Sequence, residues 1–336
     1  MVANPRGEAL SQSGRYRRAV SNEPDVLVVG AGVSGLTTAV CLAEAGLRVK
    51  IWASGTAQST TSFAAGATWN PYLVESSARA RAWSFETLDV LRELAAKPGA
   101  GVALRRGIEV AEEPPEWRDR LDGFRMLGPD ELPGDLPDGI AAGWTLVAPV
   151  VDMPTYLGYL RGRAEAAGVR IEPHRLASLD QVVAPAVVNC TGIGARDLVG
   201  DRGVVPVRGQ IVVVENPGLT DFLIMESDPP VYFFPQGATV VLGGTAQRGD
   251  DNTEPDPDTA VAIVQRCTRV EPRLDGARVV GHRVGLRPSR PTVRLEREGR
   301  IIHNYGHGGA GVTLSWGCAR QVAAMLVPTA GRGSPS

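Results

Sequence analysis

Short apolar runs alternate with glycine-rich turns where the structured part of the chain is expected to begin. Val26–Val29 form an apolar run typical of a strand that is buried on both faces. The turn GAGVSG follows, and apolar residues then repeat at helical spacing from Leu36 until Gly46 ends the helix. Residues 48–52 (RVKIW) have the pattern of a second strand. These segments predict one βαβ unit with a right-handed crossover.

Further along the chain this alternation is interrupted and then resumes. We expect helices over residues 78–96 and 155–168 and a strand over residues 184–192. Between residues 202 and 284, the runs GQIVVVE, VYFFP and TVVLGG are typical of an antiparallel sheet. Residues 300–326 have the pattern of a strand followed by a helix. The sequence therefore predicts an α/β fold in which a second region is inserted into a doubly wound domain.

The predicted organisation has two domains and two polar tails. The first domain is Rossmann-like and discontinuous, and the second is an α+β domain built on a mixed, largely antiparallel sheet. The first tail is either a basic targeting arm or an extension from a start codon upstream of the true one. The assignments are residues 25–75, 145–201 and 285–328 for the first domain, 76–144 and 202–284 for the second, and 1–24 and 329–336 for the tails.

Composition and charge narrow the classes of function. The formal charge of the 336 residues is −2, so there is no overall basic field to hold a nucleic acid or an anionic membrane. No apolar stretch approaches the 18 residues of a membrane span. The cysteines show neither a CxxC pair nor metal spacing, so we expect reduced thiols, no metal site and a cytoplasmic location. They are Cys41, Cys190, Cys267 and Cys318.

Two glycine-rich loops, one near each end of the chain, point to a dinucleotide cofactor. In GAGVSG, Gly30 permits a tight turn, Gly32 lets the backbone approach a pyrophosphate, and Gly35 lets the helix pack on the strand. The acidic residue that usually binds ribose is missing, because Ser54 stands at the end of the second strand. This departure does not decide between NAD and FAD. A second loop, Gly306–Gly311 (GHGGAG), again precedes a helix, and a second helix N-terminus favours FAD because it would stabilise the negative charge of a reduced flavin.

Several longer motifs carry a resemblance to a known family. VLVVGAGVSGLTTA, STTSFAAGATWNPY, VVNCTG, VRGQIVVVE, VVLGG, GLRPSRP, RLERE and HNYGHGGAGVTLSWGCA occur in this order between residues 26 and 326. Together they resemble the FAD-dependent D-amino-acid oxidases and D-aspartate oxidases. The resemblance implies a Rossmann-like FAD-binding domain with a substrate domain over the flavin. It also implies non-covalent FAD, a small-molecule D-amino acid and O2 as partners, and a homodimer.

The resemblance implies three substrate-binding residues. Arg287 matches the arginine that grips the substrate carboxylate, a task that suits the planar guanidinium fork. Tyr232 matches a tyrosine whose hydroxyl contacts the same carboxylate, and Gly309 matches a glycine whose carbonyl accepts a hydrogen bond from the substrate amine. The α-hydrogen would then leave as hydride to flavin N5 without a general base. The products would be a 2-oxo acid, ammonia and hydrogen peroxide. His307 would be a loop or cofactor-contact residue rather than a proton acceptor.

The cofactor residues follow from the same motifs. They lie in the first glycine loop, at the end of the second predicted strand, in STTSFAAG, after VRIEP, in VVNCTG and in the second glycine loop. The implied set is Gly30, Ala31, Gly32, Val33, Ser34, Gly35, Ser54, Thr60, Thr61, Ala65, Gly66, Leu176, Thr191, Gly308, Gly311 and Thr313.

The chain departs from the family pattern around the substrate pocket. IMESDPPVY is short and lacks the second tyrosine of an active-site lid, so we expect a more open pocket that accepts bulky D-amino acids. The arginine that D-aspartate oxidases carry after LGG is replaced by Ala246, although Arg248 could substitute for it. Glu226 and Asp228 would repel a second carboxylate, so neutral D-amino acids are favoured over acidic ones. A non-catalytic flavin protein and an NAD-dependent dehydrogenase are the remaining alternatives.

Overall fold

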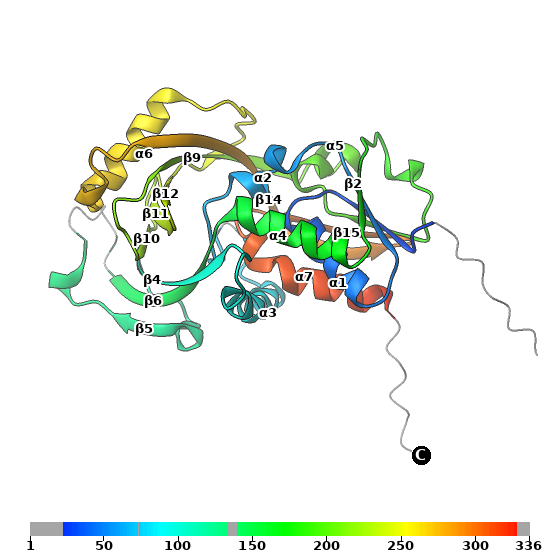
Figure 1. Ribbon diagram of the computed structural model, residues 1–336, viewed down its shortest axis with the longest axis horizontal. Helices are drawn as coiled ribbons and strands as arrows, with labels where there is room; N and C mark the ends of the chain where they lie inside the picture. Colours follow the sequence, from blue (N-terminus) through cyan, green and yellow to red (C-terminus); the bar gives the residue numbers. More distant parts are fainter. Residues whose placement is uncertain (1–22, 73, 134–139, 141, 328–336) are drawn as a thin grey trace, which may run out of the picture.

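The computed structural model describes residues 23–72, 74–133, 140 and 142–327. Of the two predicted tails, only residues 23 and 24 fall within these ranges, and the rest lies outside the described residues. The chain in these ranges forms one 15-stranded sheet, with helices packed against it (Figure 1). The predicted combination of a doubly wound α/β part with a largely antiparallel part is confirmed.

The parallel part of the sheet carries the predicted βαβ unit. All four residues of β1 are buried, because the strand has neighbours on both sides and packed layers on both faces. Between β1 and β2 the chain forms helix α1, Val33–Glu44, as the periodicity predicted. The order across this part is β15 (Ile301–His307), β8 (Ala186–Asn189), β1 (Val26–Val29), β2 (Val49–Ala53) and β7 (Arg170–Pro173), all mutually parallel.

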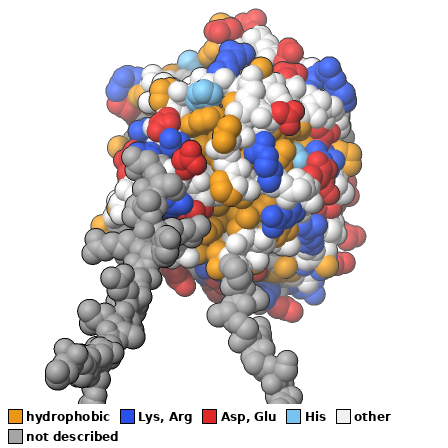
Figure 2. Space-filling view, turned by 90° about the vertical axis from the view of Figure 1, so that its right-hand side faces the viewer, with side chains coloured by type: hydrophobic (Ala, Val, Ile, Leu, Met, Phe, Trp, Pro, Cys, Tyr) orange, Lys and Arg blue, Asp and Glu red, His pale blue; other side chains and the backbone are white. Residues whose placement is uncertain are grey.

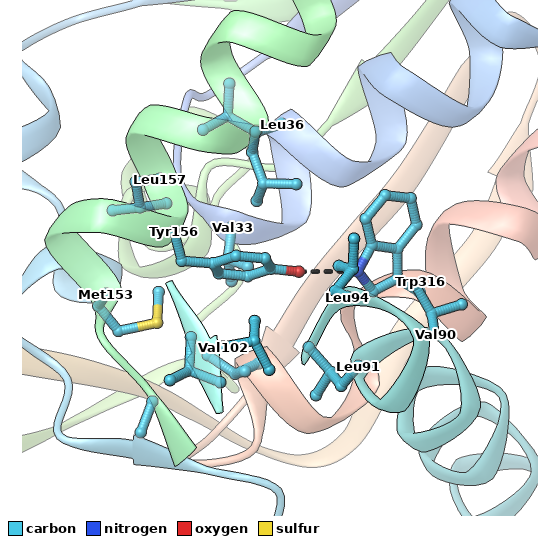
Figure 3. Packing of buried hydrophobic residues seen from close by; sticks show 14 of the residues in the cluster. Val33, Leu36, Val90, Leu91, Leu94, Val102, Met153, Tyr156, Leu157 and Trp316 are labelled. Atoms are coloured by element: carbon cyan, nitrogen blue, oxygen red, sulfur yellow. Dashed lines mark hydrogen bonds between the residues drawn. The ribbon is translucent and has the colours of Figure 1, made fainter. Parts of the chain in front are cut away.

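Four helices pack together beside the parallel strands. Helix α7 (Gly311–Leu326) contacts both α1 and α3 (Ala78–Ala95), and α4 (Met153–Ala166) contacts α1. Their interior is largely apolar, and among its buried polar contacts the indole nitrogen of Trp316 donates to the hydroxyl of Tyr156 at 2.7 Å (Figure 3). Because the two polar groups bond to each other, the hydrogen bond offsets part of the desolvation cost of burying these large aromatic side chains.

The antiparallel part forms the other half of the sheet. Helix α6 (Pro257–Val270) covers its outer face and buries Ile263 and Cys267 against β9, β11 and β12. The strands in spatial order are β3 (Ala67–Thr68), β6 (Ala142–Val151), β4 (Val102–Ala111), β10 (Phe222–Met225), β11 (Val231–Gln236), β12 (Thr239–Gly243) and β9 (Val205–Glu215). Two short strands flank this path: β5 (Asp122–Met126) pairs with β6, and β13 (Gln247–Arg248) pairs with β9.

Strand β14 (Val279–Glu298) joins the two halves. It pairs with β9 from Val279 to Ser289 and with β15 from Ser289 to Glu298. The predicted domain boundary at residue 285 falls inside this strand. Helix α3, assigned to the second domain, packs against α7 of the first. One sheet therefore runs through both halves, and the division into two domains stays a prediction.

The surface at the parallel end of the sheet carries charges of both signs. Figure 2 shows Lys and Arg side chains interspersed with Asp and Glu side chains over this face. No helix within the described residues is both long and apolar enough to cross a membrane. The four cysteines are free thiols, and three of them are buried.

Candidate active site

A single large cavity of about 1810 Å³ follows the carboxyl ends of the parallel strands and continues over the antiparallel sheet. The segments directly after β1, β2 and β8 line it, as expected for ligand sites in open α/β sheets. Pockets for a single small ligand are typically about 300–1,000 Å³, so this cavity has room for a dinucleotide and a small substrate together.

All but two of the predicted site residues line this cavity. The lining residues are Gly30, Ala31, Gly32, Val33, Ser34, Ser54, Thr60, Thr61, Ala65, Gly66, Leu176, Thr191, Tyr232, Arg287, Gly308, Gly309 and Gly311. The two exceptions are Gly35 and Thr313, each of which has another structural task.

The first glycine turn is held together by close backbone contacts. Gly30 has φ +109°, and a Cβ there would lie 2.5 Å from the carbonyl oxygen of Cys190. A Cβ on Gly35 would lie 1.9 Å from the carbonyl oxygen of Gly30. Gly35 therefore lets helix α1 pack on the turn, which is the packing role that the spacing predicted. Gly35 does not line the cavity, but it packs against Gly30, which does.

Thr313 lies outside the lining because its hydroxyl bonds inward to the chain. Its Oγ1 donates to the carbonyl oxygen of Asn70 at 2.7 Å and accepts from the Asn70 amide at 3.1 Å. Asn70 itself lines the cavity. The Thr313 side chain therefore fixes the backbone of a lining residue, and its direct contact with a cofactor stays a prediction.

Two helix N-termini open into the cavity. Gly32, Val33 and Ser34 at the start of α1 line it, and so do Gly311 and Val312 at the start of α7. The first amides of a helix have no carbonyl partner within it and carry partial positive charge, which favours an anion. In the protein chain alone, the Val33 amide donates to the Ser62 hydroxyl at 3.0 Å.

The second glycine loop carries a buried neutral histidine. His307 lines the cavity, and its Nε2 lies 3.1 Å from Oδ1 of Asn304. The Asn304 amide donates to Thr38 Oγ1 at 3.2 Å, which turns the acceptor oxygen toward the ring, so Nε2 carries the proton. Burial lowers the pKa of His307 to about 4. The ring is therefore uncharged at neutral pH, in keeping with the prediction of a loop or cofactor-contact residue.

Arg287 and Tyr232 lie over glycines in the neighbouring strands. A Cβ on Gly209 of β9 would lie 2.5 Å from Nη1 of Arg287, and a Cβ on Gly243 of β12 would lie 2.0 Å from Cζ of Tyr232. The Arg287 Nη1 also donates to the carbonyl oxygen of Thr245 at 2.9 Å. Burial raises the pKa of Tyr232, while the nearby Arg287 lowers it. The sheet thus holds a cation and a phenol hydroxyl side by side.

Tyr72 connects this pair to the second glycine loop. Its ring centroid lies 5.7 Å from Cζ of Arg287, and a Cβ on Gly309 would lie 2.5 Å from its Cδ1. Burial and the acidic residues Glu226 and Asp228 raise the pKa of Tyr72, and Arg287 lowers it. The three predicted substrate-binding residues therefore meet around one aromatic ring.

Some residues of this site were not assigned a role by the sequence. Gly209, Gly243 and Tyr72 stand in VRGQIVVVE, VVLGG and STTSFAAGATWNPY, which the resemblance used only as a pattern. Glu109 lines the cavity and carried no signal in the sequence. Arg248 lies outside the cavity lining, is exposed, and its Nη1 is 3.4 Å from Ser289 Oγ. The expectation that it could replace the missing arginine is therefore not supported.

Comparison with known proteins gives a consistent result. Residues 25–325 match the model of the DAO family, described as FAD dependent oxidoreductase. D-amino-acid oxidases from Streptomyces coelicolor and Rubrobacter xylanophilus are 48% and 47% identical to the chain, covering 90% and 89% of it and 96% and 94% of their own lengths. Human D-aspartate oxidase is 35% identical over 90% of the chain and 94% of its own length. Glycine oxidase from Geobacillus kaustophilus has a similar fold, with a TM-score of 0.77 at 22% identity, covering 92% of the chain and 96% of its own.

Proposed function

Because this chain belongs to the DAO family of FAD-dependent oxidoreductases, we propose that it is an oxidase of neutral D-amino acids. The observation that carries the proposal is the pairing of Arg287 with Tyr232 in the cavity that both glycine loops line. A guanidinium and a phenol hydroxyl held side by side suit a carboxylate. The match to the family model and to the curated relatives confirms the resemblance that the sequence motifs indicated, at the level of the family.

The cavity fits FAD. The close backbone contacts at Gly30 leave no room for a side chain, and the start of α1 offers amides for the pyrophosphate. Farther along, Trp52 stacks on His174 with ring centroids 4.0 Å apart, and both residues line the cavity beside Leu176 and Ser54, where the adenosine would bind. FAD, when bound, supplies the oxidising power, accepting the α-hydrogen of the substrate as hydride and passing the electrons to O2 to give hydrogen peroxide.

The protein's own residues orient the substrate. Arg287 would bind both carboxylate oxygens, and its position is set by its hydrogen bond to Thr245 and by the flat surface of Gly209. The Tyr232 hydroxyl would donate to one of these oxygens, and the carbonyl of Gly309 would accept from the amine. Such fixed orientation supplies much of the rate in reactions that need no general base. Because His307 is uncharged at neutral pH, the charges of the site are those of Arg287 and the carboxylates.

The acidic wall of the pocket supports neutral over acidic substrates. Glu109, Glu226 and Asp228 line the substrate end of the cavity, and burial raises the pKa of Glu226. A second substrate carboxylate would meet these groups without the arginine that D-aspartate oxidases carry after LGG. We include in the proposal a cytoplasmic location, which rests on the cysteine pattern of the sequence, and a homodimer, which rests on the family resemblance.

Peroxide production from D-alanine, D-aspartate and L-alanine in parallel tests the proposal. We expect a yellow protein with non-covalent FAD that produces peroxide from D-alanine, far less from D-aspartate and none from L-alanine. In Arg287→Leu, kcat/KM for D-alanine should fall about 100-fold or more, because a charge-assisted carboxylate contact is lost. Arg118→Leu, at an exposed position, is the matched control. A yellow protein inactive on all three amino acids would overturn the oxidase assignment and favour a non-catalytic flavin protein.

A further inference from the structure

One row of cross-strand neighbours extends from the proposed carboxylate-binding pair along the cavity wall. Tyr232 of β11 pairs with Ile224 of β10, and Ile224 pairs with Glu109 of β4. Directly paired residues point to the same face of a sheet, and all three line the cavity. Adjacent strands are about 4.8 Å apart, so the backbone at Glu109 lies roughly 10 Å from that at Tyr232.

The Glu109 carboxylate is held by neutral groups only. Its Oε2 accepts from the indole nitrogen of Trp144 at 3.1 Å, and the side chain of Asn70 also hydrogen-bonds to it. Among the described residues, no lysine or arginine forms a salt bridge with it. A carboxylate removed from water without a cation is costly, so a cationic ligand would be stabilised there.

The neighbouring charge strengthens this preference. The amide of Glu226 donates to the carbonyl of Val110 at 2.9 Å, which brings a second carboxylate beside Glu109. Burial, together with the charge of Glu226, raises the pKa of Glu109 to about 7. A bound ammonium or guanidinium group would relieve the repulsion between the two acids and favour the ionised form of Glu109.

The distance suits a long substrate side chain. The ε-ammonium of lysine is five bonds from the α-carbon, or about 6 Å in the extended zigzag conformation, in which each bond of about 1.5 Å advances the chain by about 1.25 Å. With the substrate carboxylate at Arg287 and Tyr232, such a chain would run along Ile224 toward Glu109. The apolar part of the chain would then contact Ile224, and its charged end would meet the carboxylate.

We propose that Glu109 determines specificity by binding the cationic end of long D-amino-acid side chains, so that the enzyme oxidises D-lysine and D-arginine besides neutral D-amino acids. This proposal rests on the proposed oxidase function. It extends the substrate range to D-amino acids with cationic side chains, which the acidic residues of the pocket favour. Glu109 takes no part in the oxidation itself.

The test compares two substrates that share a hydrocarbon chain but differ in charge. We measure kcat/KM for D-lysine and D-norleucine in the wild type and in Glu109→Gln. The ratio of the D-lysine value to the D-norleucine value should fall by about 10- to 100-fold in the variant, mainly through the KM of D-lysine, as expected for a hydrogen bond between charged groups. The ratio normalises any loss common to both substrates.

Two further variants show whether the carboxylate itself is responsible. Glu109→Asp keeps the charge and should restore part of the preference for D-lysine. Glu93→Gln, which removes an exposed carboxylate on α3 outside the cavity lining, should leave the ratio unchanged within about twofold. If Glu109 had only a structural role, Glu109→Gln would lower kcat/KM for both substrates by the same factor and leave the ratio constant.

The outcomes separate this inference from the function on which it rests. If D-norleucine is oxidised but D-lysine is not, or if Glu109→Gln leaves the ratio unchanged, the inference is wrong and the oxidase function stands. If no D-amino acid is oxidised by the yellow protein, the proposed function fails, and the inference fails with it.

Discussion

At the scale of single residues, the substrate end of the site depends as much on missing side chains as on present ones. Arg287 and Tyr232 lie over Gly209 and Gly243, where any Cβ would fall within 2.5 Å of their side-chain atoms. These glycines belong to β9 and β12, whereas Arg287 and Tyr232 belong to β14 and β11. Each glycine is therefore required because a side chain from a different strand occupies the space where its Cβ would lie.

Gly209→Ala tests this dependence. The new methyl group would displace the Arg287 guanidinium from its position beside Tyr232, while both residues and the cofactor segments remain. We expect the KM for D-alanine to rise at least tenfold with FAD still bound, since small misplacements of a binding group strongly reduce rates. Gly281→Ala on β14 is the control, because a Cβ there meets nothing within 4 Å. Equal KM values in the two variants would contradict the proposed role of Gly209.

This residue scale also shows what the sequence could and could not predict. GLRPSRP and VYFFP are specific enough to indicate Arg287 and Tyr232, and the structure brings both to one cavity. The glycines beneath them were recognised only as parts of motifs, because their partners come from other strands. The hydrogen bond of the Thr313 hydroxyl to Asn70 could not be predicted, because Asn70 lies 243 residues away in the sequence. Glu109 was missed because its partner Trp144 lies 35 residues away.

At the scale of elements, the cofactor end of the cavity depends on how tightly α1 packs on the turn after β1. Local spacing was sufficient to predict this unit, because the strand, the turn and the helix are adjacent in sequence. The 20-residue strand β14 was not predicted, because it changes partners from β9 to β15 along its length. The positions of β14 that are buried therefore differ between its two halves, and no single alternation of apolar and polar residues marks the whole strand.

Gly35→Ala tests the packing of α1. The added Cβ would lie 1.9 Å from the carbonyl oxygen of Gly30, so the helix must move away from the turn. Overpacking of this kind typically costs about 1–3 kcal/mol, and we expect weaker FAD binding in equilibrium titrations as well. Gly162→Ala in α4 meets nothing within 4 Å and should instead stabilise its helix by up to about 1 kcal/mol. Unchanged FAD affinity in Gly35→Ala would show that the turn tolerates a shift of the helix.

At the scale of the whole molecule, one continuous sheet joins the cofactor end of the cavity to the substrate end. Each end contains a titratable group, the buried His307 and the partly buried Glu109, and the pKa values of the two are displaced in opposite senses. Burial lowers the pKa of His307 to about 4 and raises that of Glu109 to about 7. Both groups are therefore largely uncharged in the folded protein at pH 5, whereas both ionise to a large extent in the unfolded chain. Their contributions to the pH dependence of stability oppose each other between pH 5 and pH 7.

Unfolding by urea at pH 7 and at pH 5 separates the two contributions. The unfolded chain binds more protons at His307 than the folded protein does below its ordinary pKa of 6.5, so this residue destabilises the fold as the pH falls. From the displacement to about 4, the loss at pH 5 is about 2 kcal/mol. The folded protein binds more protons at Glu109 above its ordinary pKa of 4.5, so the stability that this residue contributes falls by a similar amount, about 2 kcal/mol, as the pH rises from 5 to 7.

On acidification from pH 7 to pH 5, His307→Asn should therefore gain stability relative to the wild type and Glu109→Gln should lose it. His282→Asn, at an exposed position, is the control and should follow the wild type. Shifts of the same sign in the two cavity variants would contradict the burial of these groups in their uncharged forms.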